Sequence, residues 1–233
     1  MKNREAAERS LWLIWYNLDV TASASPPDDD PPQHCVLRNV SWSFYEQLLE
    51  EIGNSPIFVT FHHGEIEIMS PVAEQQLAKK SIGVLVQQLT LGFNMPIRCF
   101  GSTTLQNEDK KVGLEPDECY YLRNESKVRG MKKQFDPTLY PPPDLAIEVD
   151  VTHRSIPRLP IYAALGVPEV WRYDGRITVL LLNSSGHYEP SAVSPNFPSV
   201  PLDQFQAFVD RMLGEEEQNA VIEEFRDWAK GLK

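Results

Sequence analysis

The sequence predicts an α/β or α+β fold in which a mixed β-sheet is flanked by helices. The chain has 233 residues, of which 42% are hydrophobic and 24% charged, as is usual for a globular protein with one sizeable core. Along the chain, helical and strand-like hydrophobic spacing alternate in the order helix, hairpin, long helix, strands, helix, strands, helix. This order is typical of a layered fold in which helices cover the faces of a sheet.

Two parts are predicted, an N-terminal helix and linker over residues 1–33 and a folded domain over 34–233. The segment SASPPDDDPP (23–32) is rich in proline and aspartate and is expected to be a linker. In the domain, Ser43 and Glu46 have the spacing of a capping box, and the helix that they open should end at Gly53. The strands PIFVTFHH and GEIEIMS, with Gly64 at the bend, predict a hairpin.

A long helix is predicted from Pro71 to about Gly92, because apolar residues recur there with helical spacing. These residues are Leu77, Ile82, Leu85, Val86 and Leu89. PIRCFGSTTLQ and LEPDECYYL are expected to be strands. A helix that ends at Gly166, three antiparallel strands and a helical tail from Pro201 complete the domain.

Composition limits the compartment and the partners. No apolar run is long enough to span a bilayer, and the N-terminus lacks the features of a signal peptide. The cysteines Cys35, Cys99 and Cys119 are far apart, which favours reduced thiols in the cytoplasm and argues against a zinc cluster. The net charge of −11 disfavours broad contact with nucleic acid, but residues 123–133 hold five basic side chains and one acid. This segment is either a local phosphate contact or a solvated loop.

The stretch PPPDLAIEVDVTHRS (141–155) places several acids on one face of a predicted strand. Side chains alternate between the faces of a strand, so Asp144, Glu148 and Asp150 share one side of a strand that we expect to be half-buried. Like charges at this spacing raise one another's pKa unless a cation lies among them. That cation could be a metal ion or a neighbouring Arg or Lys, or water alone could solvate the acids.

Asp117, which follows Pro116 at the start of another strand, is the other candidate acid. A Pro-Asp pair followed on an adjacent strand by an acid such as Glu148 suits Mg²⁺, which prefers oxygen ligands and is held by one or two carboxylates plus phosphate. The alternative is that Asp117 shapes a turn and that Glu148 pairs with a basic side chain. Spacing alone leaves both interpretations open.

The ordered series GEIEIMSP, EPDECYYL, PPPDLAIEVDVT and LPIYAALGVPEVWRYD resembles the Uma family of restriction-endonuclease-like nucleases, over about residues 40–210. The resemblance implies the PD-(D/E)XK core, in which Asp117 and Glu148 are the first and second acids and bind Mg²⁺, for which Mn²⁺ substitutes. It also implies DNA as the substrate and a homodimer.

The sequence departs from the superfamily pattern at the third residue of the triplet, where Asp150 takes the place of the lysine. The resemblance implies that a basic residue comes instead from the following helix, which assigns Arg158. Arginine keeps its proton near neutral pH, so activation of water would depend on the metal. An acid from the long helix is sometimes added to such sites, and Glu74 is the candidate; alternatively, Glu74 is only a favourable charge in the first helical turn.

The sequence thus predicts a Mg²⁺-dependent endonuclease that hydrolyses phosphodiester bonds of DNA, with Asp117, Glu148, Arg158, Asp150 and Glu74 as candidate catalytic residues. The alternatives are a catalytically degenerate dimeric binding or regulatory protein of the same fold, and a metal-dependent hydrolase of a small phosphorylated molecule.

Overall fold

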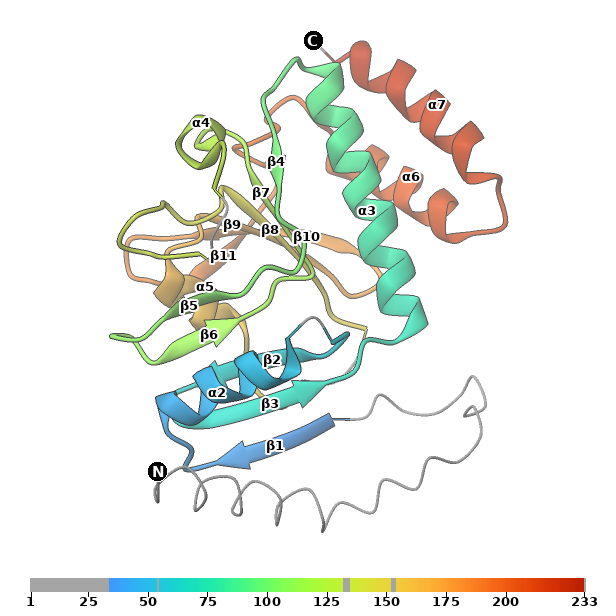
Figure 1. Cartoon of the computed structure of the whole chain (residues 1–233). Coiled ribbons are helices and arrows are strands. Elements are labelled where there is room, and N and C mark those ends of the chain that lie inside the picture. The colour runs from blue at the N-terminus through green and yellow to red at the C-terminus, as the bar shows by residue number, and fades with distance from the viewer. Residues whose placement is uncertain (1–33, 54, 132–134, 152–153, 233) are drawn as a thin grey trace, which may run out of the picture. The chain divides into compact units, whose positions relative to one another are not determined.

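The computed structural model describes residues 34–53, 55–131, 135–151 and 154–232 (Figure 1). The predicted helix and linker over residues 1–33 lie outside these ranges. The described chain forms a mixed α and β structure, which confirms the predicted fold class. Its strands, however, are divided between two sheets, whereas the sequence predicted one. No helix in the described ranges is long and apolar enough to cross a membrane.

The first sheet has the strand order β1-β3-β2-β6-β5, and its neighbouring strands are antiparallel. The predicted hairpin is present, and its turn is made by His63 and Gly64, with φ angles of 48° and 90°. Glycine adopts such angles without steric cost, which explains its place at the bend. The strands are β1 (His34–Arg38), β2 (Phe58–His62), β3 (Glu65–Met69), β5 (Leu105–Asn107) and β6 (Val112–Leu114).

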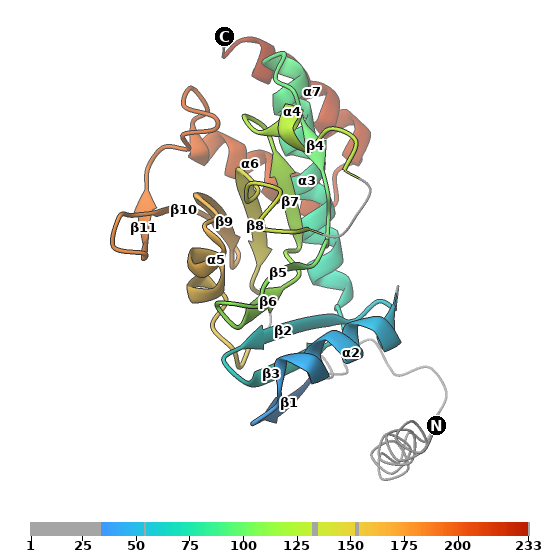
Figure 2. The ribbon, with the colours of Figure 1, turned by 60° about the vertical axis from the view of Figure 1, so that its left-hand side comes forward.

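Helix α2 (Trp42–Ile52) packs its buried aromatic residues on this first sheet (Figure 2). Its N-cap is Ser41, whose hydroxyl accepts a hydrogen bond from the backbone N–H of Phe44 at 3.2 Å. The prediction of Ser43 as the capping residue was wrong, because Ser43 is already inside the helix whereas Ser41 has the extended backbone that a cap requires. The helix ends before Gly53, as predicted.

The second sheet has the order β11-β10-β9-β8-β7-β4. It is mixed, because β8 and β9 run parallel while its other neighbours are antiparallel. Helix α5 (Leu159–Leu165) makes the connection that two parallel strands require, and it ends at Gly166 with φ of 80°. The strands are β4 (Arg98–Cys99), β7 (Glu118–Tyr121), β8 (Leu145–Val149), β9 (Glu169–Tyr173), β10 (Ile177–Leu182) and β11 (Tyr188–Ser191).

The chain passes between the two sheets three times, first through the long helix α3 (Ala73–Gly92), which connects β3 to β4. Each of the other two passages divides a segment that the sequence predicted to be one strand. Of these two, the first lies between β4 and β5, where Gly101 has φ of 54°. The second lies between β6 and β7, where Pro116 has no N–H to offer a ladder. The passage from β6 to β7 places Asp117 between the sheets.

Helices α3 (Ala73–Gly92), α6 (Leu202–Leu213) and α7 (Gln218–Lys230) lie together along one side of the second sheet (Figures 1 and 2). Leu145, Ile147 and Val149 of β8 join the same apolar cluster as the buried residues of these helices. The predicted apolar stripe of α3 is confirmed from Ile82 onward. Leu77, however, is 45% exposed, although the next residue, Ala78, is buried in this cluster, so Leu77 lies off the buried face of the helix.

The opposite face of β8 is also covered. Ala146 packs in a second apolar cluster with residues of α5, β5 and β6. All five residues of β8 are therefore buried, and the expectation of a half-buried strand was wrong. Any acid on that face of β8 lies in the interior, where it needs partners.

Candidate active site

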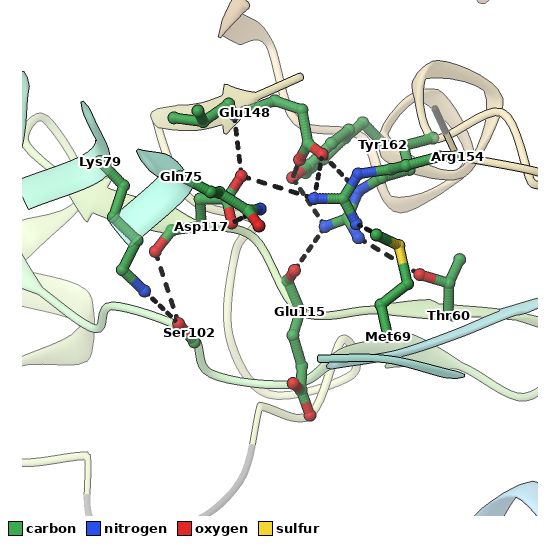
Figure 3. Close-up of polar contacts among 12 residues, drawn as sticks. Thr60, Met69, Gln75, Lys79, Ser102, Glu115, Asp117, Glu148, Arg154 and Tyr162 are labelled. Atoms are coloured by element: carbon green, nitrogen blue, oxygen red, sulfur yellow. Dashed lines mark hydrogen bonds and ion pairs between the residues drawn. The ribbon is translucent and has the colours of Figure 1, made fainter. Parts of the chain in front are cut away.

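Asp117 lies at the edge of the second sheet with a fully buried carboxylate (Figure 3). Its Oδ1 accepts a hydrogen bond from Nε2 of Gln75 at 2.9 Å, and its Oδ2 accepts one from the backbone N–H of Val149 at 2.8 Å. The antiparallel register of β7 and β8 pairs Glu118 with Ile147. Asp117 and Glu148 are the next residues of this register, so they lie side by side at the end of the paired segment. The structure thus brings together the two acids that the sequence singled out.

Glu148 is surrounded by cationic and hydroxyl groups. Its Oε1 lies 2.8 Å from Nε of Arg158 and 3.2 Å from Nη2 of Arg154, and its Oε2 accepts a hydrogen bond from the hydroxyl of Tyr162 at 2.7 Å. Neither ion pair has hydrogen-bond geometry at Oε1, which has no hydrogen-bond partner among the described residues. This buried oxygen is therefore paired with the two guanidinium groups through charge alone.

Arg154 answers the question of which cation lies among the acids. Its Nη2 is 3.2 Å from Oε1 of Glu148 and 3.6 Å from Oδ2 of Asp117, so a single nitrogen contacts both carboxylates (Figure 3). The Arg154 side chain is only 7% exposed. In the structure, therefore, an arginine stands between the two acids.

Arg158 is buried and directed at Glu148, as the sequence predicted. Its guanidinium also donates to Oγ1 of Thr60 at 3.2 Å and to the backbone carbonyl of Glu115. Burial by itself would lower the pKa of Arg158, but Glu148, Tyr162 and Asp117 together outweigh it and hold the pKa above its ordinary value. Arg158 is thus a fixed positive charge and cannot serve as a proton acceptor.

Burial, followed by the nearby charge of Glu148, raises the pKa of Asp117 to about 6. The two arginines and the N–H of Val149 oppose this rise. A cation of higher charge beside Asp117 would favour its ionised form more strongly than they do. The site therefore has an electrostatic preference for additional positive charge.

The other acids of the β8 segment have different neighbours. Asp144 is at the far end of the strand, where its carboxylate accepts hydrogen bonds from the backbone N–H groups of Leu122 and Asn124 and from the Asn124 amide. Asp150 lies just past the strand and is partly buried, and burial followed by Glu148 raises its pKa. Among the described residues Asp150 forms no ion pair. Of the three acids, only Glu148 contacts the two arginines.

In a comparison with protein-family models, residues 42–212 match Uma2, which is described as "Putative restriction endonuclease". The match covers well over half of the chain. The chain belongs to the Uma2 family. No curated protein matches the chain. The match confirms the resemblance to the Uma family that the sequence motifs indicated.

The long helix of this Uma2 protein contributes a different residue from the one expected. Glu74 is exposed in the first turn of α3, and it has no polar contact with Asp117 or Glu148 in the described structure. The next residue, Gln75, is buried and donates to Asp117. One helical turn further on, the Lys79 ammonium donates to Ser102 at 3.1 Å, and the Ser102 hydroxyl donates to the Asp117 carbonyl at 3.4 Å.

The residues present fit a Mg²⁺ ion that is held by two carboxylates. Asp117 and Glu148 offer hard oxygen donors from adjacent strands, and Oε1 of Glu148 has no hydrogen bond. No group of three or more His, Cys, Asp or Glu side chains in the described ranges could hold a metal. The remaining ligands would have to be water and phosphate, as is usual for Mg²⁺. The Arg154 guanidinium occupies the space between the donors, so an ion would enter only as Arg154 moves.

The sequence prediction missed three residues that contact the two acids, namely Arg154, Gln75 and Tyr162. Arg154 and Gln75 gave no pattern, because each lies at an irregular connection or helix start and its direction depends on the fold. Tyr162 did give a signal, since it lies four residues after Arg158 and such pairs share a helix face. Its hydroxyl indeed reaches both Glu148 and Arg158.

The described part of the basic segment, residues 123–131, lies away from this site. It includes the short helix α4 (Glu125–Val128). Asn124 binds Asp144 there, whereas Glu148 is near the opposite end of the strand. Arg129 forms an ion pair with Glu125. The described part of the segment is therefore separate from the candidate active site.

Proposed function

We propose that this Uma2 protein is a Mg²⁺-dependent endonuclease that hydrolyses phosphodiester bonds of DNA. The observation that supports this most is the placement of Asp117 and Glu148 side by side between the two sheets, with one buried carboxylate oxygen free of hydrogen bonds. The family assignment supports the reaction class.

Asp117 and Glu148 would hold the ion, and Mn²⁺ is expected to substitute. When bound, Mg²⁺ supplies charge that stabilises the phosphate and lowers the pKa of coordinated water. The protein's part is to fix the two carboxylates. Gln75 and the N–H of Val149 orient Asp117, and Tyr162 orients Glu148.

Arg158 contributes a permanent positive charge beside Glu148. We propose that it positions this carboxylate and stabilises negative charge that develops on the phosphate, since it cannot accept a proton. Asp150, just past β8, would adjust the charge of the site without holding the ion itself. Glu74, which is exposed, is the weakest of the proposed catalytic residues.

A second candidate function is a catalytically degenerate binding or regulatory protein. The observation that favours it is the pair of arginines, which already neutralise the acids without a metal. Buried arginine–carboxylate clusters are also found as purely structural features. The two functions differ in whether the acids bind a divalent ion.

Thermal unfolding in EDTA, Mg²⁺ or Mn²⁺ distinguishes them. A metal that binds only the folded state raises the melting temperature through mass action. We expect this shift in the wild type, a partial shift in Asp150→Asn and none in Glu148→Gln. Glu108→Gln, which changes an exposed acid paired with Lys111 and without contact to Asp117 or Glu148 in the described structure, is the control. Identical shifts in all four proteins would contradict the metal site.

Cleavage assays then test the reaction. We expect the wild type to convert supercoiled plasmid to nicked or linear DNA with Mg²⁺ or Mn²⁺ and to lose this activity in Glu148→Gln. Hydrolysis of small phosphorylated molecules without DNA cleavage would instead favour a small-molecule hydrolase.

A further inference from the structure

We propose that Arg154 is a displaceable internal counter-ion, which lies between Asp117 and Glu148 in the metal-free protein and transfers to Glu67 when a divalent ion enters. This inference rests on the proposed metal site. It adds Arg154 as a competitor of the metal ion and Glu67 as the carboxylate that pairs with the displaced Arg154. It makes metal binding an exchange of cations at the two acids.

Arg154 is held less firmly than its neighbour Arg158. Apart from its ion pairs with the two acids, its polar contact is Nη1 at 3.8 Å from the sulfur of Met69, a weak acceptor. Its Nε is buried and has no hydrogen-bond partner among the described residues. Arg158 is additionally anchored by Thr60 and by the Glu115 carbonyl. Displacement of Arg154 therefore breaks fewer hydrogen bonds than displacement of Arg158.

Glu67 is a buried carboxylate close to the same backbone segment. It lies on β3 and is 1% exposed, and its Oε1 accepts a hydrogen bond at 2.6 Å from the N–H of Ser155, the residue after Arg154. Met69, two residues further along β3, has its side chain on the same face and contacts Arg154. Glu67 thus lies next to the backbone that carries Arg154 and on the strand whose Met69 the Arg154 guanidinium contacts.

The second oxygen of Glu67 has no hydrogen-bond partner in the described part of the chain. Its Oε2 is buried and accepts no hydrogen bond in the described structure. A buried carboxylate oxygen without a partner is costly, and a guanidinium is the donor that best satisfies it. The unpaired Oε2 of Glu67 therefore supports the transfer of Arg154, in addition to the weak hydrogen bonding of Arg154 itself.

Charge pairing gives the exchange its direction. A divalent ion and a guanidinium repel each other and cannot share the space between Asp117 and Glu148. An arginine that is displaced but still buried would be strongly unfavourable without an anion beside it. Glu67 keeps Arg154 paired, so the ion gains both carboxylates without leaving an isolated charge.

The test measures Mn²⁺ affinity by isothermal titration calorimetry. We expect Arg154→Gln to bind Mn²⁺ at least about tenfold more tightly than the wild type, because the competitor is gone. Glu67→Gln should bind it several-fold more weakly, since the displaced arginine has lost its acceptor. Arg176→Gln, which removes an exposed arginine paired with Asp203, serves as the matched control and should leave the affinity unchanged.

The double variant separates transfer from simple attraction of the ion by Glu67. If Glu67 acts by receiving Arg154, its substitution should have no effect in the Arg154→Gln background. An equal loss of affinity in both backgrounds would overturn the transfer. Arg154→Lys, which retains the charge but not the two-pronged group, guards against a folding defect and should bind Mn²⁺ with an affinity between wild type and Arg154→Gln.

The outcomes also separate this inference from the proposed function. Wild-type binding that is lost in Glu148→Gln but unchanged in both Arg154 variants would overturn the counter-ion and leave the metal site intact. Absence of Mn²⁺ binding in every variant would overturn both. Binding by Arg154→Gln alone would support both, with Arg154 as a strong competitor.

Discussion

At the scale of single residues, the buried and partly buried carboxylates of this protein differ in how many hydrogen-bond donors stabilise their charge. Glu169 accepts hydrogen bonds from Ser194, Trp171 and Asn196, which makes it a structural acid. Among the described residues, the carboxylate of Glu115 has a single side-chain donor, the hydroxyl of Thr104 at 3.1 Å. Burial raises the pKa of Glu115 to about 7. An incompletely compensated acid of this kind links stability to pH.

We expect Glu115 to make the protein less stable as pH rises from about 4.5 to about 7. In this range the folded state keeps a proton that the unfolded state releases, so the free energy of unfolding falls, by up to about 3 kcal/mol for this group. Glu115→Gln stays neutral and should lose this part of the pH dependence. The measurement is urea unfolding of both proteins at about pH 5 and about pH 8.

Glu108→Gln, at an exposed acid, provides the comparison and should follow the wild type at both pH values. A pH dependence in Glu115→Gln equal to that of the wild type would mean that Glu115 titrates normally.

At the scale of elements, α2 is fitted to the first sheet through a close contact with β6. The ring of Tyr45 lies over Gly113, where a Cβ would be 2.3 Å from the tyrosine oxygen and 2.8 Å from Cζ. Tyr45 is completely buried, so its ring has little room to shift. Gly113 is thus required by packing, since its φ is not in the left-handed region.

Gly113→Ala should therefore destabilise the protein by about 1–3 kcal/mol, the usual cost of overpacking. Tyr45→Phe removes the nearest atom, and its hydroxyl has no hydrogen-bond partner in the described chain, so this change alone should be nearly neutral. The double variant should be more stable than Gly113→Ala. Urea unfolding of the four proteins measures these free energies, and an unaffected Gly113→Ala would show that α2 can move.

At the scale of the whole described domain, Arg158 connects the two sheets. It contacts Thr60 on β2 of the first sheet and Glu148 on β8 of the second, and it also donates to the Glu115 carbonyl in the passage between them. Because these partners come from three parts of the chain, the loss of one side chain should loosen both sheets together.

Arg158→Lys keeps the charge, but its single ammonium cannot reach all of these acceptors. We expect a loss of about 2–4 kcal/mol in unfolding free energy, in the range found when buried polar networks are broken. Hydrogen exchange should become faster in β2 as well as in β8. Arg172→Lys, at the exposed pair with Asp174, should change stability by less than about 1 kcal/mol. Faster exchange confined to β8 would contradict the connecting role.

The expected homodimer also belongs to this scale and stays a prediction. Sedimentation velocity should give a species of twice the 26.6 kDa chain mass, with the fraction of dimer rising with concentration. A single species of the chain mass at all concentrations would contradict it.

The sequence by itself determined the elements that depend on local spacing. The hairpin around Gly64, the long helix α3 and the ends of α2 and α5 at glycines were predicted, because these features depend on periodicity and on residues that tolerate particular backbone angles. The parity of Glu148 and its relation to Asp117 were also readable, since adjacent strands fix which residues can be neighbours.

Tertiary structure alone decided how the acids are compensated. Local pattern did not reveal that two predicted strands are each divided between sheets, that β8 is buried on both faces, or that Gln75 rather than Glu74 contacts Asp117. It also gave no sign that Arg154 lies between Asp117 and Glu148. The reason is that the partners of a buried charge are set by contacts between distant segments, whereas sequence periodicity reports only on neighbours along the chain.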